Sequence, residues 1–308
     1  MFGGTVALRR ALYRAGVLRS YRVPVPVIVI GNITAGGTGK PPLVLWVCEF
    51  LREQGYAPGI VSRGYGGRGE TMAVRGDSAP DIAGDEPVLL AQRSRCPVWI
   101  GRNRVAAARA LIASNPQCNV IVSDDGLQHY RLRRDVEIAV LDGGRTTGNG
   151  LPLPAGPLRE STARLAEVDA VVVTGDGSVP GASAATFAMR LEGNLFFNLL
   201  NPGFHQEAGA FHGKQVHAVA GIGNPLRFFD HLQRLGLSFA AHAFPDHHAY
   251  AQGDLEFGDA DAIIMTEKDA IKCVHFAREN HWVLPVDARV DNALGRLILE
   301  KLKTRHGS

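Results

Sequence analysis

The segment GNITAGGTGKPPLVLWV, residues 31–47, combines the residue types that bind phosphate. It follows an apolar run, VPVIVI, and passes through closely spaced glycines to a single lysine. In phosphate-binding loops, backbone N–H groups and the following helix N-terminus hold phosphate oxygens, and the lysine reaches the β- and γ-phosphates. The sequence therefore predicts a nucleotide site formed by consecutive residues: Thr34, Ala35, Gly36, Gly37, Thr38, Gly39, Lys40 and Pro41.

Two residues of this loop depart from the usual pattern. Thr34 stands where the pattern has its first glycine, and Pro41 stands where it has the hydroxyl that binds Mg²⁺. Proline is tolerated in the first turn of a helix, so the helix after Lys40 can still form. A plain glycine turn after a strand remains the alternative for the loop taken by itself.

A pair of acidic residues further along the chain supports the nucleotide interpretation. Asp124 and Asp125 follow the apolar run CNVIV. In phosphate-loop enzymes an acidic residue at such a strand end holds Mg²⁺ directly or through water. A turn closed by Asp-Asp-Gly would explain the same letters. No Asn-Lys-x-Asp motif for guanine follows, because Lys268 is directly followed by Asp269 in MTEKDAIKC, so ATP is the expected nucleotide.

The elements that must position these residues alternate along the chain. Short apolar runs at 25–32, 58–64, 96–101, 118–125, 136–142 and 170–175 read as buried strands, and 43–53, 86–94 and 104–114 read as helices between them. Unbroken apolar strands separated by helices predict a parallel sheet covered on both faces. The predicted fold class is α/β: a doubly wound, P-loop NTPase-like domain followed by a smaller α/β domain.

The expected domain boundary lies in the turn-rich segment GDGSVPGASAA, residues 175–185. The prediction is a basic N-terminal helix over 1–22, a kinase-like domain over 23–180 and the smaller domain over 181–308. The smaller domain is expected to include the last helix, NALGRLILEKLKTRH.

Composition limits the partners. A net charge of +3 over 308 residues is too small to make nucleic acid the main partner, and the four scattered cysteines fit a reducing cytoplasm. The first 22 residues carry five arginines and no acid, with Arg9, Arg10 and Arg14 opposite an apolar face. Such a helix can lie on an anionic membrane, or it can pack its apolar face on the core.

Eight segments together resemble one family, the tetraacyldisaccharide 4'-kinases, over essentially the whole chain. These segments are VPVIVIGNITAGGTGK (25–40), SRGYGG (62–67), GDEPVLLA (84–91), SDDGLQHYRLRRD (123–135), GNGLPLPAGPLRE (148–160), AGIGNPLRFF (220–229), FPDHHAY (244–250) and MTEKDAIKC (265–273). The resemblance implies transfer of the γ-phosphate of ATP, with Mg²⁺, to the 4'-hydroxyl of an acylated glucosamine disaccharide 1-phosphate lipid. It also implies a peripheral enzyme on the cytoplasmic face of the inner membrane, with no obligate protein partner.

The resemblance further implies roles for individual residues. Asp85 of GDEP and His247 of FPDHH are expected to form the acid–base pair, although taken alone Asp85 could be a helix cap and His247 a strand-end residue. Glu160 is expected near the metal together with Asp124 and Asp125. Three further residues are expected at the substrate: Gln128, His129 and Arg159.

Two other functions stay open at this point. One is a phosphate-loop NTPase that drives a partner protein, against which the missing guanine motif and the missing Cys/His clusters count. The other is a non-catalytic descendant, which Pro41 keeps under consideration.

Overall fold

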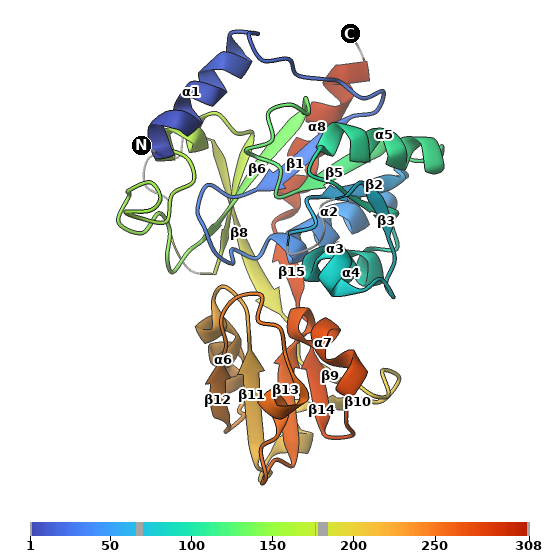
Figure 1. The fold of residues 1–308 in the computed structure, drawn as a ribbon, viewed down its shortest axis with the longest axis vertical. Helices are drawn as coiled ribbons and strands as arrows, with labels where there is room; N and C mark the ends of the chain where they lie inside the picture. The colour runs from blue at the N-terminus through green and yellow to red at the C-terminus, as the bar shows by residue number, and fades with distance from the viewer. Residues whose placement is uncertain (1, 66–69, 176, 178–183, 307–308) are drawn as a thin grey trace.

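The computed structural model describes residues 2–65, 70–175, 177 and 184–306. It shows two sheets that lie one after the other along the long axis of the molecule (Figure 1). The expected boundary at 180/181 and the last two residues of SRGYGG fall outside these ranges.

The larger sheet contains nine strands within the described ranges, in the order β15-β8-β7-β6-β1-β5-β2-β4-β3. From β8 to β4 neighbouring strands are parallel, whereas β15 and β3 are antiparallel edges. The strands are β1 Val27–Gly31, β2 Pro58–Ser62, β3 Met72–Val74, β4 Val98–Ile100, β5 Val120–Asp124, β6 Val136–Asp142, β7 Ala170–Thr174, β8 Ala185–Glu192 and β15 Asp287–Val290.

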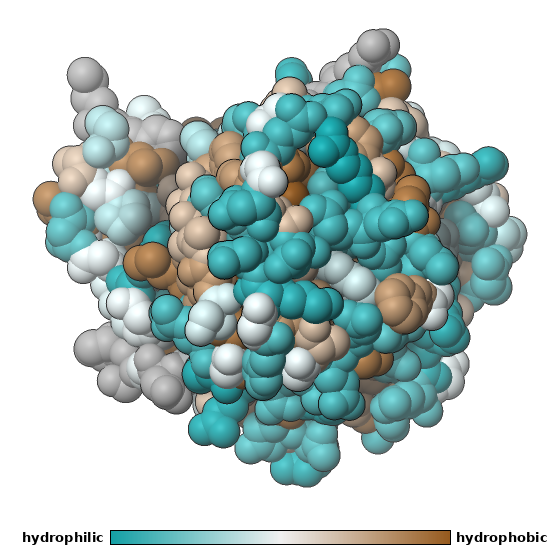
Figure 2. Space-filling view, turned by 90° about the horizontal axis from the view of Figure 1, so that it is seen from below, coloured by the Kyte–Doolittle hydropathy of each residue, from teal (hydrophilic) through white to brown (hydrophobic). Residues whose placement is uncertain are grey.

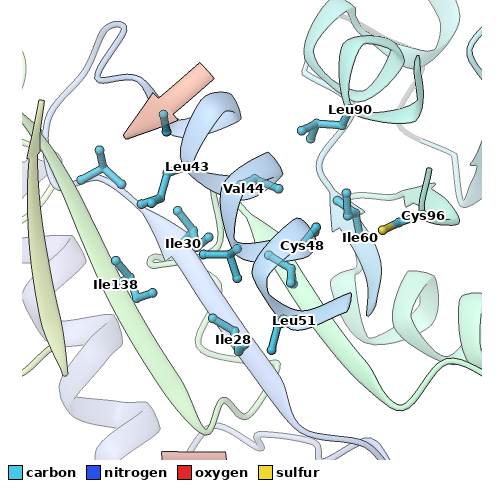
Figure 3. Packing of buried hydrophobic residues seen from close by; sticks show 14 of the residues in the cluster. Ile28, Ile30, Leu43, Val44, Cys48, Leu51, Ile60, Leu90, Cys96 and Ile138 are labelled. Carbon is cyan, nitrogen blue, oxygen red and sulfur yellow. The ribbon is translucent and has the colours of Figure 1, made fainter. Parts of the chain in front are cut away.

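Helices cover both faces of this sheet, as the alternating pattern predicts. Ile28 and Ile30 of β1 pack on one face against the cluster that holds α2 and α8 (Figure 3), while Val27 and Val29 point to the opposite face toward α5. The helices of this unit are α2 Lys40–Glu53, α3 Pro80–Ala83, α4 Asp85–Ser94, α5 Arg104–Ser114, α8 Asn292–His306 and the 3₁₀ turn η1 Thr162–Ala166. The doubly wound fold class is therefore confirmed.

The smaller sheet has the order β10-β9-β14-β13-β11-β12, with its own core on each face. Its strands are β9 Leu195–Asn198, β10 His205–Glu207, β11 Val216–Ala220, β12 Ala240–Ala243, β13 Ala262–Thr266 and β14 His281–Leu284. Two helices belong to it, α6 Pro225–Arg234 and α7 Glu267–Cys273, together with the 3₁₀ turns η2 Ala208–Phe211, η3 Gln252–Leu255 and η4 Val274–Phe276.

The end of the chain returns to the larger sheet, which differs from the expected grouping of 181–308 into one domain. β8 and β15 pair with each other, and α8 buries Leu294, Ile298 and Leu302 in the core beside α2. The smaller unit is thus inserted between β8 and β15. Its two connections run side by side, because Gly193 packs so closely on the carbonyl oxygen of Pro285 that a Cβ would not fit between them.

The N-terminal helix α1, Phe2–Arg14, is shorter than the expected 1–22 and lies at the end of the molecule opposite the smaller unit (Figure 1). On the predicted apolar face Leu8 is 61% exposed, whereas Leu12 and Leu18 are half-buried, so that face is covered only in part. The opposite end of the molecule is predominantly hydrophilic (Figure 2). No helix among the described residues is long and apolar enough to cross a membrane.

Candidate active site

The glycine loop joins the end of β1 to the start of α2. Gly36 and Gly39 have φ values of 97° and 85°, which a side chain would strain. Pro41 lies in the first turn of α2, where no N–H is needed, and the helix begins at Lys40, three residues before the predicted 43–53. A neighbouring strand holds the backbone of the loop: Thr174 Oγ1, at the end of β7, donates to the carbonyl oxygen of Thr38 at 2.7 Å.

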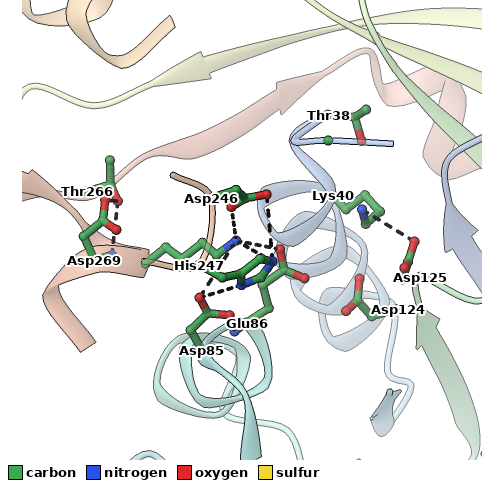
Figure 4. Close-up of polar contacts among 12 residues, drawn as sticks. Thr38, Lys40, Asp85, Glu86, Asp124, Asp125, Asp246, His247, Thr266 and Asp269 are labelled. Carbon is green, nitrogen blue, oxygen red and sulfur yellow. Dashed lines mark hydrogen bonds and ion pairs between the residues drawn. The ribbon is translucent and has the colours of Figure 1, made fainter. Parts of the chain in front are cut away.

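Lys40 reaches Asp125, the residue directly after β5. Its Nζ lies 3.5 Å from Asp125 Oδ1 (Figure 4). Arg159 Nη1 lies 3.1 Å from Asp125 Oδ2. Burial alone would raise the pKa of Asp125, but these two cations outweigh it and lower that pKa. Asp125 is therefore a carboxylate held between two cations, at a left-handed φ of 47°.

Asp124 is fully buried and differs from its neighbour. Ser62 Oγ donates to its Oδ2 at 2.9 Å, while its Oδ1 is buried without a hydrogen-bond partner. Burial, followed by the negative charge of Glu86, raises the pKa of Asp124 to about 7. An unsatisfied carboxylate oxygen beside the phosphate loop fits a hard cation such as Mg²⁺, which is usually bound through one or two carboxylates plus phosphates.

Arg104 supports both aspartates, and no sequence motif singled it out. It is the first residue of α5, is 3% exposed, and donates from Nη2 to the carbonyl oxygens of Asp124 at 3.4 Å and Asp125 at 3.3 Å. Burial lowers its pKa to about 10, although both carboxylates oppose that change. In the pattern RVAAARALIAS this arginine reads as an ordinary first helical residue.

Asp85 and His247 meet across the two units. Asp85 begins α4 in the larger unit, and His247 lies in the loop after β12 in the smaller one (Figure 4). Asp85 Oδ2 is 3.0 Å from His247 Nδ1. Burial would raise the pKa of Asp85, but the hydrogen bond to His247 and the charge of Lys268 lower it. The Asp85 bond in turn raises the pKa of His247, which has a left-handed φ of 61°.

Lys268 lies beside the Asp85–His247 pair. It was not predicted as a site residue from the sequence. Its Nζ lies 3.0 Å from Asp246 Oδ1, 3.3 Å from Glu86 Oε1 and 3.5 Å from His247 Nε2. The residue was visible in MTEKDAIKC, but its partners are 22 and 182 positions away.

The other predicted site residues have varied surroundings. Gln128 Nε2 donates to the carbonyl oxygen of Asn32 at 2.9 Å, which ties it to the glycine loop. Burial and neighbouring arginines lower the pKa of His129 to about 3, so its imidazole is neutral. The Glu160 carboxylate accepts a hydrogen bond from Tyr130 and lies 3.6 Å from Arg164 Nε.

Two hollows accompany the site. One, of about 330 Å³, lies along the glycine loop between Thr34, Thr38 and Asp142. The smaller unit lies against this loop, since a Cβ added to Gly37 would lie 3.4 Å from Gly223 Cα. The other, of about 470 Å³, lies beneath α1 and is lined by five arginines and two glutamates, together with Tyr13, Ser20 and Tyr130.

Comparisons with known proteins agree on one family. The family model described as Tetraacyldisaccharide-1-P 4'-kinase matches residues 1–303. The chain is 51% identical over 298 residues to a tetraacyldisaccharide 4'-kinase of Methylobacillus flagellatus, covering 96% of this chain and 88% of that one. It is 50% identical over 311 residues to one from an Azoarcus species, covering 100% and 90%.

A solved structure gives the same result. The "apo" form of LpxK from Aquifex aeolicus, in complex with ATP, superposes with a TM-score of 0.82 at 28% identity, covering 98% of this chain and 96% of that one.

Proposed function

The chain belongs to the tetraacyldisaccharide 4'-kinase family, which makes it an ATP-using kinase of lipid A biosynthesis, and from this membership we propose how its residues carry out the reaction. Phosphoryl transfer to a hydroxyl needs bound phosphates, charge neutralisation and a group that accepts the hydroxyl proton. Each of these requirements has a candidate among the residues described above.

The glycine loop binds the nucleotide in this proposal. Backbone N–H groups between Gly36 and Gly39 hold phosphate oxygens, and Lys40 supplies positive charge. Lys40 is 7% exposed and already lies close to Asp125, so its ammonium group is oriented before ATP arrives. The hollow along the loop supports this assignment.

Asp124 and Asp125 hold Mg²⁺ in the proposal. When bound, the ion neutralises charge on the transferring phosphates. The buried, unpartnered Oδ1 of Asp124 is the observation that supports this role. Glu160 is the third metal candidate: Tyr130 binds one oxygen of its carboxylate, while Oε2 is buried without a hydrogen-bond partner, 3.6 Å from Arg164 Nε. Arg159 keeps Asp125 ionised beside Lys40.

Asp85 and His247 take the proton of the 4'-hydroxyl, directly or with one supporting the other. The 3.0 Å contact between Asp85 Oδ2 and His247 Nδ1 carries this part of the proposal, since two residues 162 positions apart meet there from different units. An ionised carboxylate orients the imidazole and raises its basicity.

The lipid approaches from the α1 end of the molecule. The segment 126–134 leads from the aspartates to the arginine-lined hollow, which includes Arg133, Arg134 and Arg164 and suits the substrate's 1-phosphate. His129 and Gln128 lie on the same segment. The exposed Leu8 of α1, with the basic side chains beside it, suits contact with the cytoplasmic surface of the inner membrane.

The test is transfer of labelled γ-phosphate from ATP to tetraacyldisaccharide 1-phosphate in detergent micelles. We expect labelled lipid from the wild type, and a fall of about 10²- to 10⁴-fold in kcat for Asp85→Ala and for His247→Ala, with ATP affinity little changed. The double variant should lose little more than the worse single one, because the two residues act as a unit.

Fully multiplicative losses would argue against a coupled pair. Absence of lipid product from the wild type at any Mg²⁺ concentration would support the non-catalytic alternative, and ATP hydrolysis dependent on a protein partner would support the NTPase alternative.

A further inference from the structure

Lys268 connects the two units at the proton-transfer pair. It lies on the short helix α7 of the smaller unit, and its side chain is 12% exposed. Its Nζ lies 3.3 Å from Glu86 of the larger unit and 3.0 Å from Asp246 of its own unit. The same atom lies 3.5 Å from Nε2 of His247. One ammonium group therefore contacts the catalytic imidazole and the carboxylates that flank it.

The two nitrogens of His247 have different surroundings. Nδ1 lies 3.0 Å from Asp85, whose lowered pKa keeps it a carboxylate, so Nδ1 carries the hydrogen of that bond. Nε2 is then the atom that can take a proton. An ammonium group has donors and no acceptor, so Lys268 can donate to neutral Nε2 but repels a protonated one.

We propose that Lys268 is a positioning residue of the kinase, whose ammonium group holds His247 as the neutral Nδ1–H tautomer and opposes protonation of Nε2. This inference rests on the proposed function, in which the Asp85–His247 pair accepts the substrate proton. Lys268 itself does not take part in proton transfer.

The charges around His247 show in which direction the loss of Lys268 should move the protonation of the imidazole. The carboxylate of Asp85 faces it from α4, and Asp246 Oδ2 lies 3.8 Å from Nε2 within the same loop. Tyr65, from the loop after β2, lies with its ring centroid 5.1 Å from the imidazole. Lys268, from α7, is the cation among these neighbours, and Glu86 lies behind it. Without that ammonium group, carboxylates would dominate the surroundings and the imidazole would protonate more easily.

The simpler alternative is that Lys268 only fastens the two units together. Arg93 provides a matched control, because it joins the same two helices. It binds Glu267 of α7, and its Nη2 lies 2.6 Å from Asp287 Oδ1. Its described ion pairs do not include Asp85 or His247. Loss of Arg93 removes a link between the units and leaves the imidazole's neighbours in place.

The experiment compares Lys268→Met, Lys268→Arg and Arg93→Met in the full chain. The acidic limb of the kcat/KM profile is measured for each variant, and the His247 imidazole is titrated directly by NMR, with its signal assigned from a His247→Gln sample. We expect Lys268→Met to move both midpoints upward by about one pH unit, because removing a nearby positive charge favours the protonated ring. Lys268→Arg keeps the charge and should titrate like the wild type, and so should Arg93→Met.

An unchanged His247 titration in Lys268→Met, or an equal shift in Arg93→Met, would overturn the proposal. Thermal unfolding identifies a variant that fails to fold, in which case Lys268→Gln replaces Lys268→Met. The two proposals also fail separately. Full activity of His247→Ala would refute the proposed function, whereas the NMR midpoint tests Lys268 without any turnover.

Discussion

At the scale of single residues, Pro41 changes the metal chemistry of the loop more than its shape. Its ring fits the first turn of α2, and Lys40 and the glycines keep their places. The hydroxyl that usually binds Mg²⁺ is missing, and water can replace it because Mg²⁺ commonly keeps several waters.

Pro41→Thr should therefore lower the Mg²⁺ concentration for half-maximal rate by roughly fivefold, on the order of 1 kcal/mol for one added ligand. Pro42→Thr places a hydroxyl one residue later in the same turn and serves as the control. Kinetics over a range of Mg²⁺ concentrations measures both. An identical Mg²⁺ dependence for the wild type and Pro41→Thr would mean that another group fills the role of the hydroxyl.

His247 also links stability to pH at the residue scale. Its hydrogen bond to Asp85 raises its pKa, so the folded state binds this proton more tightly than the unfolded state does. That contribution is complete below the unfolded pKa, about 6.5, and is lost as the pH rises through the higher folded value. His247→Gln should thus reduce the free energy of unfolding more at pH 5.5 than at pH 9.

Urea unfolding at the two pH values tests this, with the exposed His275→Gln as the control. Asp85 stays ionised at both pH values, because its own pKa is lowered. A loss of stability that is equal at pH 5.5 and pH 9 would contradict the assignment of the Asp85–His247 bond.

At the scale of elements, α1 carries three arginines that are not equivalent. Arg10 binds Glu167 and its side chain is 17% exposed, whereas the side chain of Arg14 is 71% exposed. Arg9 is also exposed and lies over the ring of Tyr13. The basic surface available to a membrane is therefore carried mainly by Arg9 and Arg14.

Replacing Arg9, Arg10 and Arg14 by Gln should weaken binding to anionic vesicles, by about 1 kcal/mol for each charge near the surface and less at high salt. Arg10→Gln alone should contribute least, because the Arg10 side chain is 17% exposed whereas that of Arg14, which also pairs with Glu167, is 71% exposed. Sedimentation with vesicles at two salt concentrations measures the loss. Equal binding by the wild type and the triple variant would remove the membrane role of this helix.

At the scale of the whole molecule, the smaller unit is an insertion and not a C-terminal domain. The larger sheet includes β8 and β15, which flank the insertion, and α8, which follows it. Leu294, Ile298 and Leu302 of α8 are fully buried, and burial of each contributes about 2 kcal/mol. Their sum is comparable to the entire stability of many domains.

A fragment of residues 1–180 should therefore fail to fold, although it contains the whole phosphate loop and both aspartates. A fragment of residues 193–286, which carries both cores of the smaller sheet, should unfold cooperatively. In the full chain, Leu294→Ala should lower the free energy of unfolding by about 2–5 kcal/mol. Circular dichroism and urea unfolding measure all three, and a cooperatively folded 1–180 fragment would contradict this division of the chain.

Much of this organisation was readable in the sequence because its causes are local. Glycines at 36 and 39 permit positive φ, proline at 41 suits a first helical turn, and apolar runs separated by helices form a parallel sheet. Asp124 and Asp125 stand at the end of an apolar run, which marks them as candidate ligands, whereas the pairing of β5 with β1 that brings Asp125 to Lys40 joins segments distant in the sequence.

The tertiary structure decided whatever depends on residues distant in the sequence. The pairing of β8 with β15 joins segments about a hundred positions apart, and no local pattern identifies such a partner. Arg104 and Lys268 look like ordinary helix residues until folding brings carboxylates and carbonyl oxygens around them. A side chain's charge environment is set by all its neighbours in space, which is why the sequence provides the chemical groups and the fold determines their pKa values and partners.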